Sequence, residues 1–259
     1  MKPVTAILLD LDETILFDDA ATDAAFAATA AHAARIATVE PKRLIAAVRA
    51  QADDLWDAGP DPAWCHDLGT SSVEGLRSRF LGDDPRMAAL RTWGPGFRRQ
   101  SWRQGLQACG IEDDRLAEEL DERFAHERLH TNPFIPGAEE ALRELAARFR
   151  LALVTNGLID VQRDKVIMAE IGDLFEAVVV SGELGYGKPN PAIYHHTLDL
   201  MGIAPEQAMM VGDNIRRDVG GAQAVGIKGV WIGEGVPPAE LGITPDITIR
   251  TLAELPSLV

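Results

Sequence analysis

The chain has 259 residues, of which 46% are hydrophobic and 25% are charged, and its formal net charge is −15. These fractions are ordinary for a globular protein, and the length suggests one large domain or two smaller ones. The negative charge disfavours nonspecific binding to nucleic acid or to anionic membranes.

The first predicted element is a strand at residues 4–9, and more than a hundred residues without a convincing strand follow it. We interpret residues 17–133 as a separate all-α domain that is inserted after this strand. Three turn-forming sequences are expected to break its helices: Gly59-Pro60, Gly82 and Gly94-Pro95-Gly96. Three acidic pairs are expected to start helices or to lie in solvated turns: Asp53-Asp54, Asp83-Asp84 and Asp113-Asp114.

From residue 134 onward, short β-branched runs alternate with helical patterns. Strands are predicted at residues 151–154, 177–180, 209–211 and 229–232, with a weaker one at 247–249. Helices are predicted at 137–149, 161–171, 192–201 and 218–225. Strands and helices of these lengths indicate right-handed βαβ units and a parallel sheet. The sequence therefore predicts an α/β domain formed by residues 1–16 and 134–259.

Four polar clusters lie where ligands bind in such sheets, outside the carboxyl ends of the strands. Asp10-Leu11-Asp12-Glu13-Thr14 follows the first strand, and Thr155-Asn156-Gly157 follows the second. Gly212-Asp213-Asn214 follows the fourth strand, with Asp218 a turn further on, and Gly187-Lys188-Pro189-Asn190-Pro191 precedes that strand. Each cluster alone has an ordinary explanation as a turn or a surface residue, but the four together in this order indicate one site.

The residue types in these clusters suit phosphoryl transfer. A carboxylate that attacks a phosphate dianion at ~3.5 Å meets a repulsion of roughly 9 kcal/mol at an effective dielectric of about 20, so a bridging cation is needed. Mg²⁺ prefers oxygen ligands. Asp10 and Asp213 offer two carboxylates, and a main-chain carbonyl near Asp12 offers a third oxygen.

In an anionic chain, a phosphate site also needs local positive charge and hydrogen-bond donors. Lys188 supplies a second positive charge, and Thr155 with the N–H groups of Asn156 and Gly157 supplies donors to the phosphate oxygens. Asp10 ends the strand and is assigned as the nucleophile. Asp12 is assigned as the general acid and base that protonates the leaving oxygen and later activates water.

With these motifs in place, the chain resembles the haloacid dehalogenase superfamily, whose members are mostly phosphatases with a Rossmann-like core and a mobile cap. Asp10-Leu11-Asp12-Glu13-Thr14 matches that family's first motif, and Thr155 matches the second-motif threonine or serine. Lys188 matches the third-motif lysine, and Gly212-Asp213 through Asp218 match the acidic fourth motif. The resemblance covers the core and implies that the helical insert is a cap domain.

The motif set and the cap position resemble the subgroup that contains N-acylneuraminate-9-phosphatase and pyrimidine 5′-nucleotidases. The resemblance implies an Mg²⁺-dependent phosphatase that acts on a small phosphorylated metabolite through an aspartyl-phosphate. Asp12 separates this chemistry from that of the family's dehalogenases, which lack an aspartate at that position because halide leaves without a proton. A phosphomutase, or a catalytically silent binding or regulatory protein on the same scaffold, remains an alternative.

The insert carries an unusual basic stretch. Five arginines and no acidic residue lie between Pro85 and Ile111: Arg86, Arg91, Arg98, Arg99 and Arg103. Either some of them hold an anionic part of the substrate, or they form an outer face that pairs with neighbouring acids. Four of the five tryptophans, Trp56, Trp64, Trp93 and Trp102, also lie in the insert and are expected mainly in its core.

The location of the protein follows from three further features. Cys65 and Cys109 have no C-x-x-C spacing and are expected to be reduced thiols. The apolar run before Asp10 is too short for a secretory signal, and no uncharged apolar stretch approaches the ~20 residues that cross a bilayer. We therefore expect a cytoplasmic protein with neither a membrane nor a nucleic acid as partner.

Overall fold

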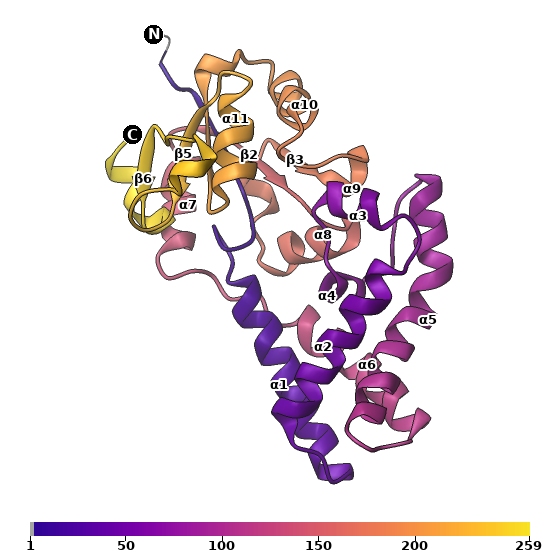
Figure 1. The fold of residues 1–259 in the computed structure, drawn as a ribbon. Helices are drawn as coiled ribbons and strands as arrows, with labels where there is room; N and C mark the ends of the chain where they lie inside the picture. Colours follow the sequence, from indigo (N-terminus) through magenta and orange to yellow (C-terminus); the bar gives the residue numbers. More distant parts are fainter. Residues whose placement is uncertain (1–2) are drawn as a thin grey trace. The chain divides into compact units, whose positions relative to one another are not determined.

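The computed structural model describes residues 3–259, and the chain folds into two compact units. The first unit contains the chain up to Asp18, together with Pro133–Asn156 and Ala169–Val259. The second unit contains Asp19–Asn132 and Gly157–Met168. Figure 1 draws the elements of both units; we call the first the α/β unit and the second the helical unit.

The α/β unit is built on a six-stranded sheet in the order β3-β2-β1-β4-β5-β6, with every neighbouring pair parallel. Its strands are β1 (Ala6–Leu9), β2 (Arg150–Thr155), β3 (Ala177–Val180), β4 (Ala208–Gly212), β5 (Lys228–Ile232) and β6 (Ile247–Ile249). All four residues of β1 are fully buried, which requires that both faces of the sheet are covered. The predicted α/β fold class is confirmed.

Helices connect and cover these strands (Figure 1). They are α7 (Ala138–Ala146), α9 (Ser181–Leu184), α10 (Pro191–Met201) and α11 (Gly221–Gln223), with a π-helical turn at Ile215–Gly220. Short 3₁₀ turns occur at Gly172–Leu174, Pro205–Gln207, Ala239–Leu241 and Leu252–Ser257. One apolar cluster packs Leu8, Val154 and Met210 of the sheet against Tyr194 and Leu198 of α10.

The helix predicted at residues 218–225 differs from the structure. The chain there forms the π-helical turn Ile215–Gly220 and then the short α11. The turn begins after Asn214, whose side chain accepts a hydrogen bond from the Arg217 N–H, while its carbonyl accepts one from the Asp218 N–H. This early start draws Asp218 into the turn instead of leaving it at the beginning of a helix.

The helical unit contains α1 (Asp18–Ile36, which begins at the last residue of the α/β unit), α2 (Pro41–Asp57), α3 (Pro62–Leu68), α4 (Ser72–Gly75), α5 (Pro85–Ala108), α6 (Asp114–Leu129) and α8 (Ile159–Met168). Its core is rich in aromatic rings. Phe26, Trp102 and Phe124 contact one another, and Trp56 contacts both Trp93 and Phe97. These contacts agree with the expectation that the tryptophans of the insert lie mainly in its core.

Helix starts in this unit follow the expected capping chemistry in part. Asp84 and Asp113 are N-caps whose carboxylates accept main-chain N–H groups of α5 and α6. Asp53 and Asp54 instead lie inside α2.

The prediction that Gly94-Pro95-Gly96 breaks a helix is wrong, because the three residues lie within α5. A Cβ on Gly94 would lie 2.2 Å from the Phe80 ring, so the glycine admits close packing that supports the helix there.

Helix α8 belongs to the helical unit, although the sequence places it between two strands of the α/β domain. Leu158 and Val161 pack in the aromatic-rich core of the helical unit. The buried carboxylate of Asp160 accepts hydrogen bonds from the Ser78 hydroxyl at 2.9 Å and from the Arg79 main-chain N–H at 2.6 Å. The two compact units therefore differ from the predicted domains at residues 157–168, and by one or two residues at the ends of the insert.

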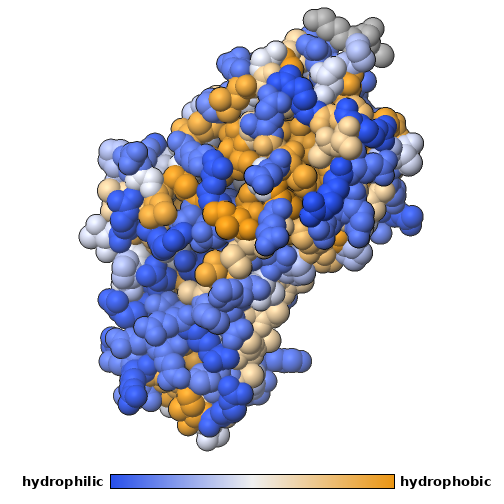
Figure 2. Space-filling view, turned by 180° about the vertical axis from the view of Figure 1, so that it is seen from behind, coloured by the Kyte–Doolittle hydropathy of each residue, from blue (hydrophilic) through white to orange (hydrophobic). Residues whose placement is uncertain are grey.

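Within residues 3–259, none of the helices is both long and apolar enough to cross a membrane. On the face drawn in Figure 2, hydrophilic residues cover most of the helical unit, and apolar residues are more frequent over the α/β unit. Cys65 and Cys109 are both free thiols, and burial raises the pKa of Cys65 to about 11, so this thiol is unreactive near neutral pH.

Candidate active site

Three neighbouring strands bring predicted site residues to one edge of the sheet. Asp10 follows β1, Thr155 ends β2, and Asp213 follows β4. Because β1 pairs with β2 on one side and with β4 on the other, the carboxyl ends of these strands lie side by side. Lys188 reaches the same edge from the loop between α9 and α10.

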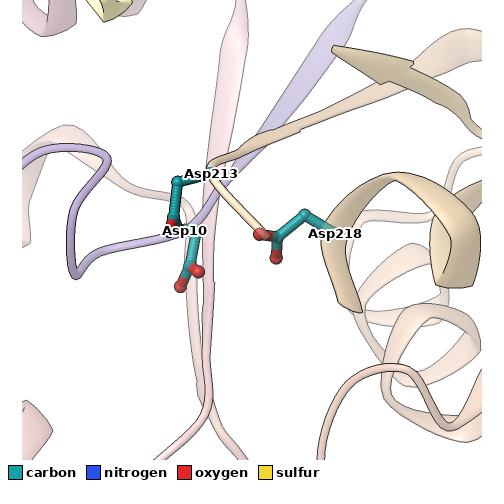
Figure 3. A group of neighbouring side chains, drawn as sticks. All are labelled: Asp10, Asp213 and Asp218. Atoms are coloured by element: carbon teal, nitrogen blue, oxygen red, sulfur yellow. The ribbon is translucent and has the colours of Figure 1, made fainter. Parts of the chain in front are cut away.

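A group of three carboxylates forms at this edge. One oxygen from each of Asp10, Asp213 and Asp218 lies within 4.8 Å of the others. Figure 3 shows Asp10 and Asp213 close together at their strand ends, with the Asp218 side chain directed towards them from its helical turn. Three acidic side chains this close repel one another strongly unless positive charge lies among them.

Lys188 supplies part of that charge. Its Nζ lies 2.9 Å from Oδ1 of Asp10 and donates a hydrogen bond to Oδ1 of Asp218 at 2.6 Å. The lysine side chain is 1% exposed and that of Asp218 is 0% exposed, so this is a buried ion pair. Burial alone lowers the pKa of Lys188, but the two aspartates outweigh that effect and raise its pKa above the ordinary value.

One lysine does not balance three carboxylates, and the aspartate pKa values reflect this. Burial, with a contribution from Asp218, raises the pKa of Asp10 to about 6 although Lys188 lowers it. Burial and the charges of Asp10 and Asp218 raise the pKa of Asp213 to about 7. Hard oxygen donors with uncompensated negative charge are the environment that a divalent cation such as Mg²⁺ prefers, so the residues present fit this metal.

Asn156 holds the main chain of Lys188. Its Oδ1 accepts a hydrogen bond from the Lys188 N–H at 2.7 Å, and its Nδ2 donates one to the Lys188 carbonyl at 2.9 Å. A Cβ on Gly187 would lie 2.7 Å from the Asn156 amide oxygen, so only glycine fits beside this pair. The Asn156 side chain is therefore engaged with the lysine loop, and the donor predicted to bind phosphate is its main-chain N–H.

The remaining predicted residues occupy different surroundings. Thr155 is buried at the end of β2. Asp12 is half-buried, forms an isolated β-bridge with Leu16, and is not part of the three-carboxylate group. The predicted metal contact near Asp12 is through a main-chain carbonyl, which does not require the Asp12 carboxylate to lie in this group. Gly157 is grouped with the helical unit, one residue beyond the boundary after Asn156.

Two aromatic residues that sequence reasoning did not select also contact the main chain of this site. The indole N–H of Trp231 donates to the Asp213 carbonyl at 2.9 Å, and the Tyr194 hydroxyl donates to the Arg217 carbonyl next to Asp218. The sequence also understates Asp218, which was predicted only as a supporting acid but directly binds Lys188. The local sequence signal for the position of Asp218 is Gly212. A Cβ at this position would lie 2.3 Å from the Asp218 carboxyl carbon, so a glycine is needed there.

The sequence profile of the haloacid dehalogenase-like hydrolases matches residues 4–226. The chain belongs to the haloacid dehalogenase-like (HAD) hydrolase family. This assignment agrees with the resemblance drawn from the four motifs, and it covers most of both units.

Curated relatives of this HAD chain carry phosphatase names. The phosphoserine phosphatase of Thermus thermophilus is 38% identical over 250 residues, which is 96% of each chain. The N-acylneuraminate-9-phosphatase of Rattus norvegicus is 33% identical over 166 residues, or 62% of this chain and 67% of that one. The predicted enzyme class, a phosphatase of the HAD family, is confirmed, and so is the resemblance to the second of these proteins.

Solved HAD structures share the fold over nearly the whole chain. The putative HAD-hydrolase YfnB from Bacillus subtilis, described as bound to magnesium, gives a TM-score of 0.66 at 20% identity and covers 99% of each chain. L-2-haloacid dehalogenase from Xanthobacter autotrophicus gives 0.61 at 19% identity and covers 98% of each. At these identities the likeness establishes the fold and leaves the chemistry to the residues of the site.

The basic stretch of this HAD chain is largely paired within the helical unit. Arg86 pairs with Asp84, and Arg103 pairs with Asp114. The Nε of Arg98 lies 3.7 Å from Oδ1 of Asp121, and its guanidinium also donates to the Ser78 carbonyl. Arg91 donates to the carbonyls of Phe80 and Gly82. Arg98 and Asp121 line a cavity of about 380 Å³, and Arg99 and Arg103 line another of about 250 Å³. These contacts favour pairing with neighbouring acids for Arg86, Arg98 and Arg103, whereas Arg91 binds main-chain carbonyls.

Proposed function

We propose that this chain is an Mg²⁺-dependent phosphatase that hydrolyses a small phosphorylated metabolite through an aspartyl-phosphate on Asp10. The observation that carries the proposal is the group of three carboxylates around one buried lysine at the edge of the sheet. This arrangement keeps a nucleophilic carboxylate beside positive charge and leaves negative charge for a divalent cation to neutralise.

In the first step, an Asp10 carboxylate oxygen attacks phosphorus, and the bond between phosphorus and the leaving oxygen breaks. The leaving oxygen takes the bonding electron pair together with a proton from Asp12, which acts as general acid. Lys188, Thr155 and the N–H groups of Asn156 and Gly157 bind the phosphoryl oxygens. The Asn156 side chain fixes the main chain of Lys188 and so holds the ammonium beside Asp10.

In the second step, water attacks the phosphorus of the aspartyl-phosphate, and Asp12, now a carboxylate, accepts the water proton. The bond between phosphorus and the Asp10 oxygen breaks, which releases inorganic phosphate and restores Asp10. Asp12 regains the proton that it gave to the leaving oxygen, so its protonation state is restored at the end of the cycle.

Asp10, Asp213 and a main-chain carbonyl near Asp12 would hold the magnesium ion, with Asp218 as a supporting acid. When bound, Mg²⁺ supplies positive charge that offsets the repulsion between the nucleophile and the phosphate. Asp218 supports this arrangement through its ion pair with Lys188, which keeps the lysine charged next to Asp10.

The relatives suggest where to begin the search for a substrate. The 38% identity to a phosphoserine phosphatase over 96% of both chains makes phosphoserine the first candidate. N-acylneuraminate 9-phosphate and glyceraldehyde 3-phosphate follow from relatives that match smaller shares of the chain. Dehalogenation is disfavoured because Asp12 provides a proton that a leaving halide does not need.

The test is phosphate release from a generic aryl phosphate and from a panel of phosphoamino acids, sugar phosphates and nucleoside monophosphates, with and without Mg²⁺. We expect release that requires Mg²⁺ and is lost in Asp10→Asn. An isomerised product without free phosphate would indicate a phosphomutase. Absence of turnover on every substrate with Mg²⁺ present, or full turnover by Asp10→Asn, would refute the proposal.

A further inference from the structure

The main chain of Asp213 is held from the neighbouring strand by an indole. In the parallel pairing of β4 with β5, Trp231 lies opposite Gly212, the residue just before Asp213. From this register the Trp231 ring extends past the end of β4, and its Nε1–H donates to the Asp213 carbonyl at 2.9 Å. The bond connects the side chain of one strand to the first residue beyond the end of the next.

The local sequence makes room for this ring. A Cβ on Gly233 would lie 2.3 Å from two atoms of the Trp231 indole, which is far inside van der Waals contact. Gly233 is itself fixed, since its N–H donates to the Ile249 carbonyl at 2.9 Å. The indole therefore packs directly on Gly233, and any larger residue at position 233 would displace the ring or the main chain.

Asp213 is a residue that needs such support. Its carboxylate lies in the three-carboxylate group with Asp10 and Asp218, which repel it, and the loop that carries it has just left the sheet. Without a restraint, that loop relieves the repulsion by turning the carboxylate away. A hydrogen bond to the main chain of the same residue opposes this movement without neutralising the carboxylate that a metal requires.

We propose that Trp231 is a positioning residue for the metal-binding carboxylate of Asp213, acting through the hydrogen bond from its indole N–H to the Asp213 carbonyl. The inference rests on the proposed function, because it assigns Asp213 to the magnesium site. Trp231 touches neither substrate nor metal in the proposed site. Its effect is to lower the cost of organising Asp213 before the cation arrives.

Trp231→Phe tests the inference, because it keeps an aromatic ring on β5 and removes the N–H donor. Calorimetric titration of the metal-free protein with MgCl₂ measures binding without reference to turnover. We expect the Kd for Mg²⁺ to rise about three- to tenfold, the size expected for loss of one neutral hydrogen bond. At saturating Mg²⁺, kcat should return to within about twofold of the unsubstituted enzyme, because the catalytic groups themselves are intact.

Two further variants separate the hydrogen bond from general loosening of the strand. Ile232→Val trims the buried neighbour of Trp231 on β5 and leaves the indole in place, so its Kd for Mg²⁺ should be unchanged. Gly233→Ala retains the indole but displaces the ring, and it should weaken Mg²⁺ binding in the same direction as Trp231→Phe. It also decides the matter if Trp231→Phe does not fold.

Mg²⁺ binding by Trp231→Phe as tight as that of the unsubstituted protein would overturn the inference and leave the proposed function intact. An equal loss in Ile232→Val would overturn it as well, because the effect would then belong to the strand. If the unsubstituted protein itself binds no Mg²⁺, the proposed metal site fails and the inference fails with it. These results are distinguishable in a single set of titrations.

Discussion

At the scale of single residues, the site is organised by hydrogen bonds to the main chains of its charged residues. Asn156 holds the peptide groups of Lys188, Trp231 holds the carbonyl of Asp213, and Tyr194 holds the carbonyl that precedes Asp218. Each contact fixes a charged side chain without altering its charge. The buried ion pair of Lys188 and Asp218 thereby keeps its geometry beside Asp10.

Tyr194→Phe should reveal the energetic contribution of one of these bonds. The Tyr194 side chain is fully buried, and burial together with Asp218 and Asp10 raises its pKa, so the hydroxyl stays a donor at any working pH. Loss of the bond to the Arg217 carbonyl should lower the free energy of unfolding in urea by about 1–2 kcal/mol. The other tyrosine is the control, and Tyr186→Phe should change this free energy by less than about 0.5 kcal/mol. Equal losses in the two variants would contradict this assignment.

At the scale of elements, the sequence predicts the strands, but it does not predict that α8 packs in the helical unit. The apolar runs of β1, β2 and β4 are near-continuous because both faces of the central sheet are covered, and this pattern is visible in the sequence. The apolar residues of α8, such as Val161, indicate a helix but not the core against which it packs. The sequence likewise gives no sign that Asp160, which follows Thr155-Asn156-Gly157, is buried against the segment around Ser78.

The sequence likewise predicts which residues form the site, but not most of the contacts among them. Polar residues after strand ends identified Asp10, Thr155 and Asp213, because ligands in parallel sheets bind at that edge. The contacts of Asn156, Tyr194 and Trp231 escaped prediction because each joins segments far apart in the chain, and no local pattern encodes such a pairing. Asp218 was visible as an acid, but its ion pair with Lys188 depends on the π-helical turn.

Asp160→Asn should loosen the attachment of α8. The Asp160 carboxylate accepts bonds from the Ser78 hydroxyl and the Arg79 main-chain N–H, and it is 2% exposed. Removal of its charge weakens charge-assisted hydrogen bonds, so the free energy of unfolding should fall by about 2 kcal/mol. Asp164→Asn is the matched control on the same helix. Its carboxylate pairs with Arg79 at the surface, and its loss should cost less than about 1 kcal/mol. An equal loss of unfolding free energy in Asp164→Asn would show that the buried hydrogen bonds of Asp160 contribute no more than the surface ion pair.

At the scale of the whole molecule, the carboxylate group makes the stability of the metal-free protein depend on pH. The pKa values of about 6 for Asp10 and about 7 for Asp213 lie above the ordinary 3.8. Between these values the folded chain binds more protons than the unfolded chain, so the stability of the metal-free protein falls as pH rises from about 4 to about 7. Mg²⁺ bound at the proposed site would favour the ionised carboxylates and oppose that loss.

Thermal denaturation with MgCl₂ or with a chelator measures this linkage. The increase in Tm that Mg²⁺ produces should be larger at about pH 8 than at about pH 5.5, where protons compete for Asp10 and Asp213. Asp213→Asn should remove most of the increase at both pH values. An increase that is equal at both pH values, or larger in acid, would show that these carboxylates do not hold the metal.

The proposed mechanism requires that Asp10 becomes phosphorylated during turnover. Borohydride reduction of acid-quenched enzyme during steady-state turnover converts an aspartyl-phosphate to homoserine, and mass spectrometry of the N-terminal peptide locates it. We predict homoserine at position 10, present only with substrate and Mg²⁺, and none at Asp12 or Asp213. Sustained phosphate release with an unmodified Asp10, when the trapping reaction detects homoserine in a control aspartyl-phosphate protein, would rule out Asp10 as the nucleophile.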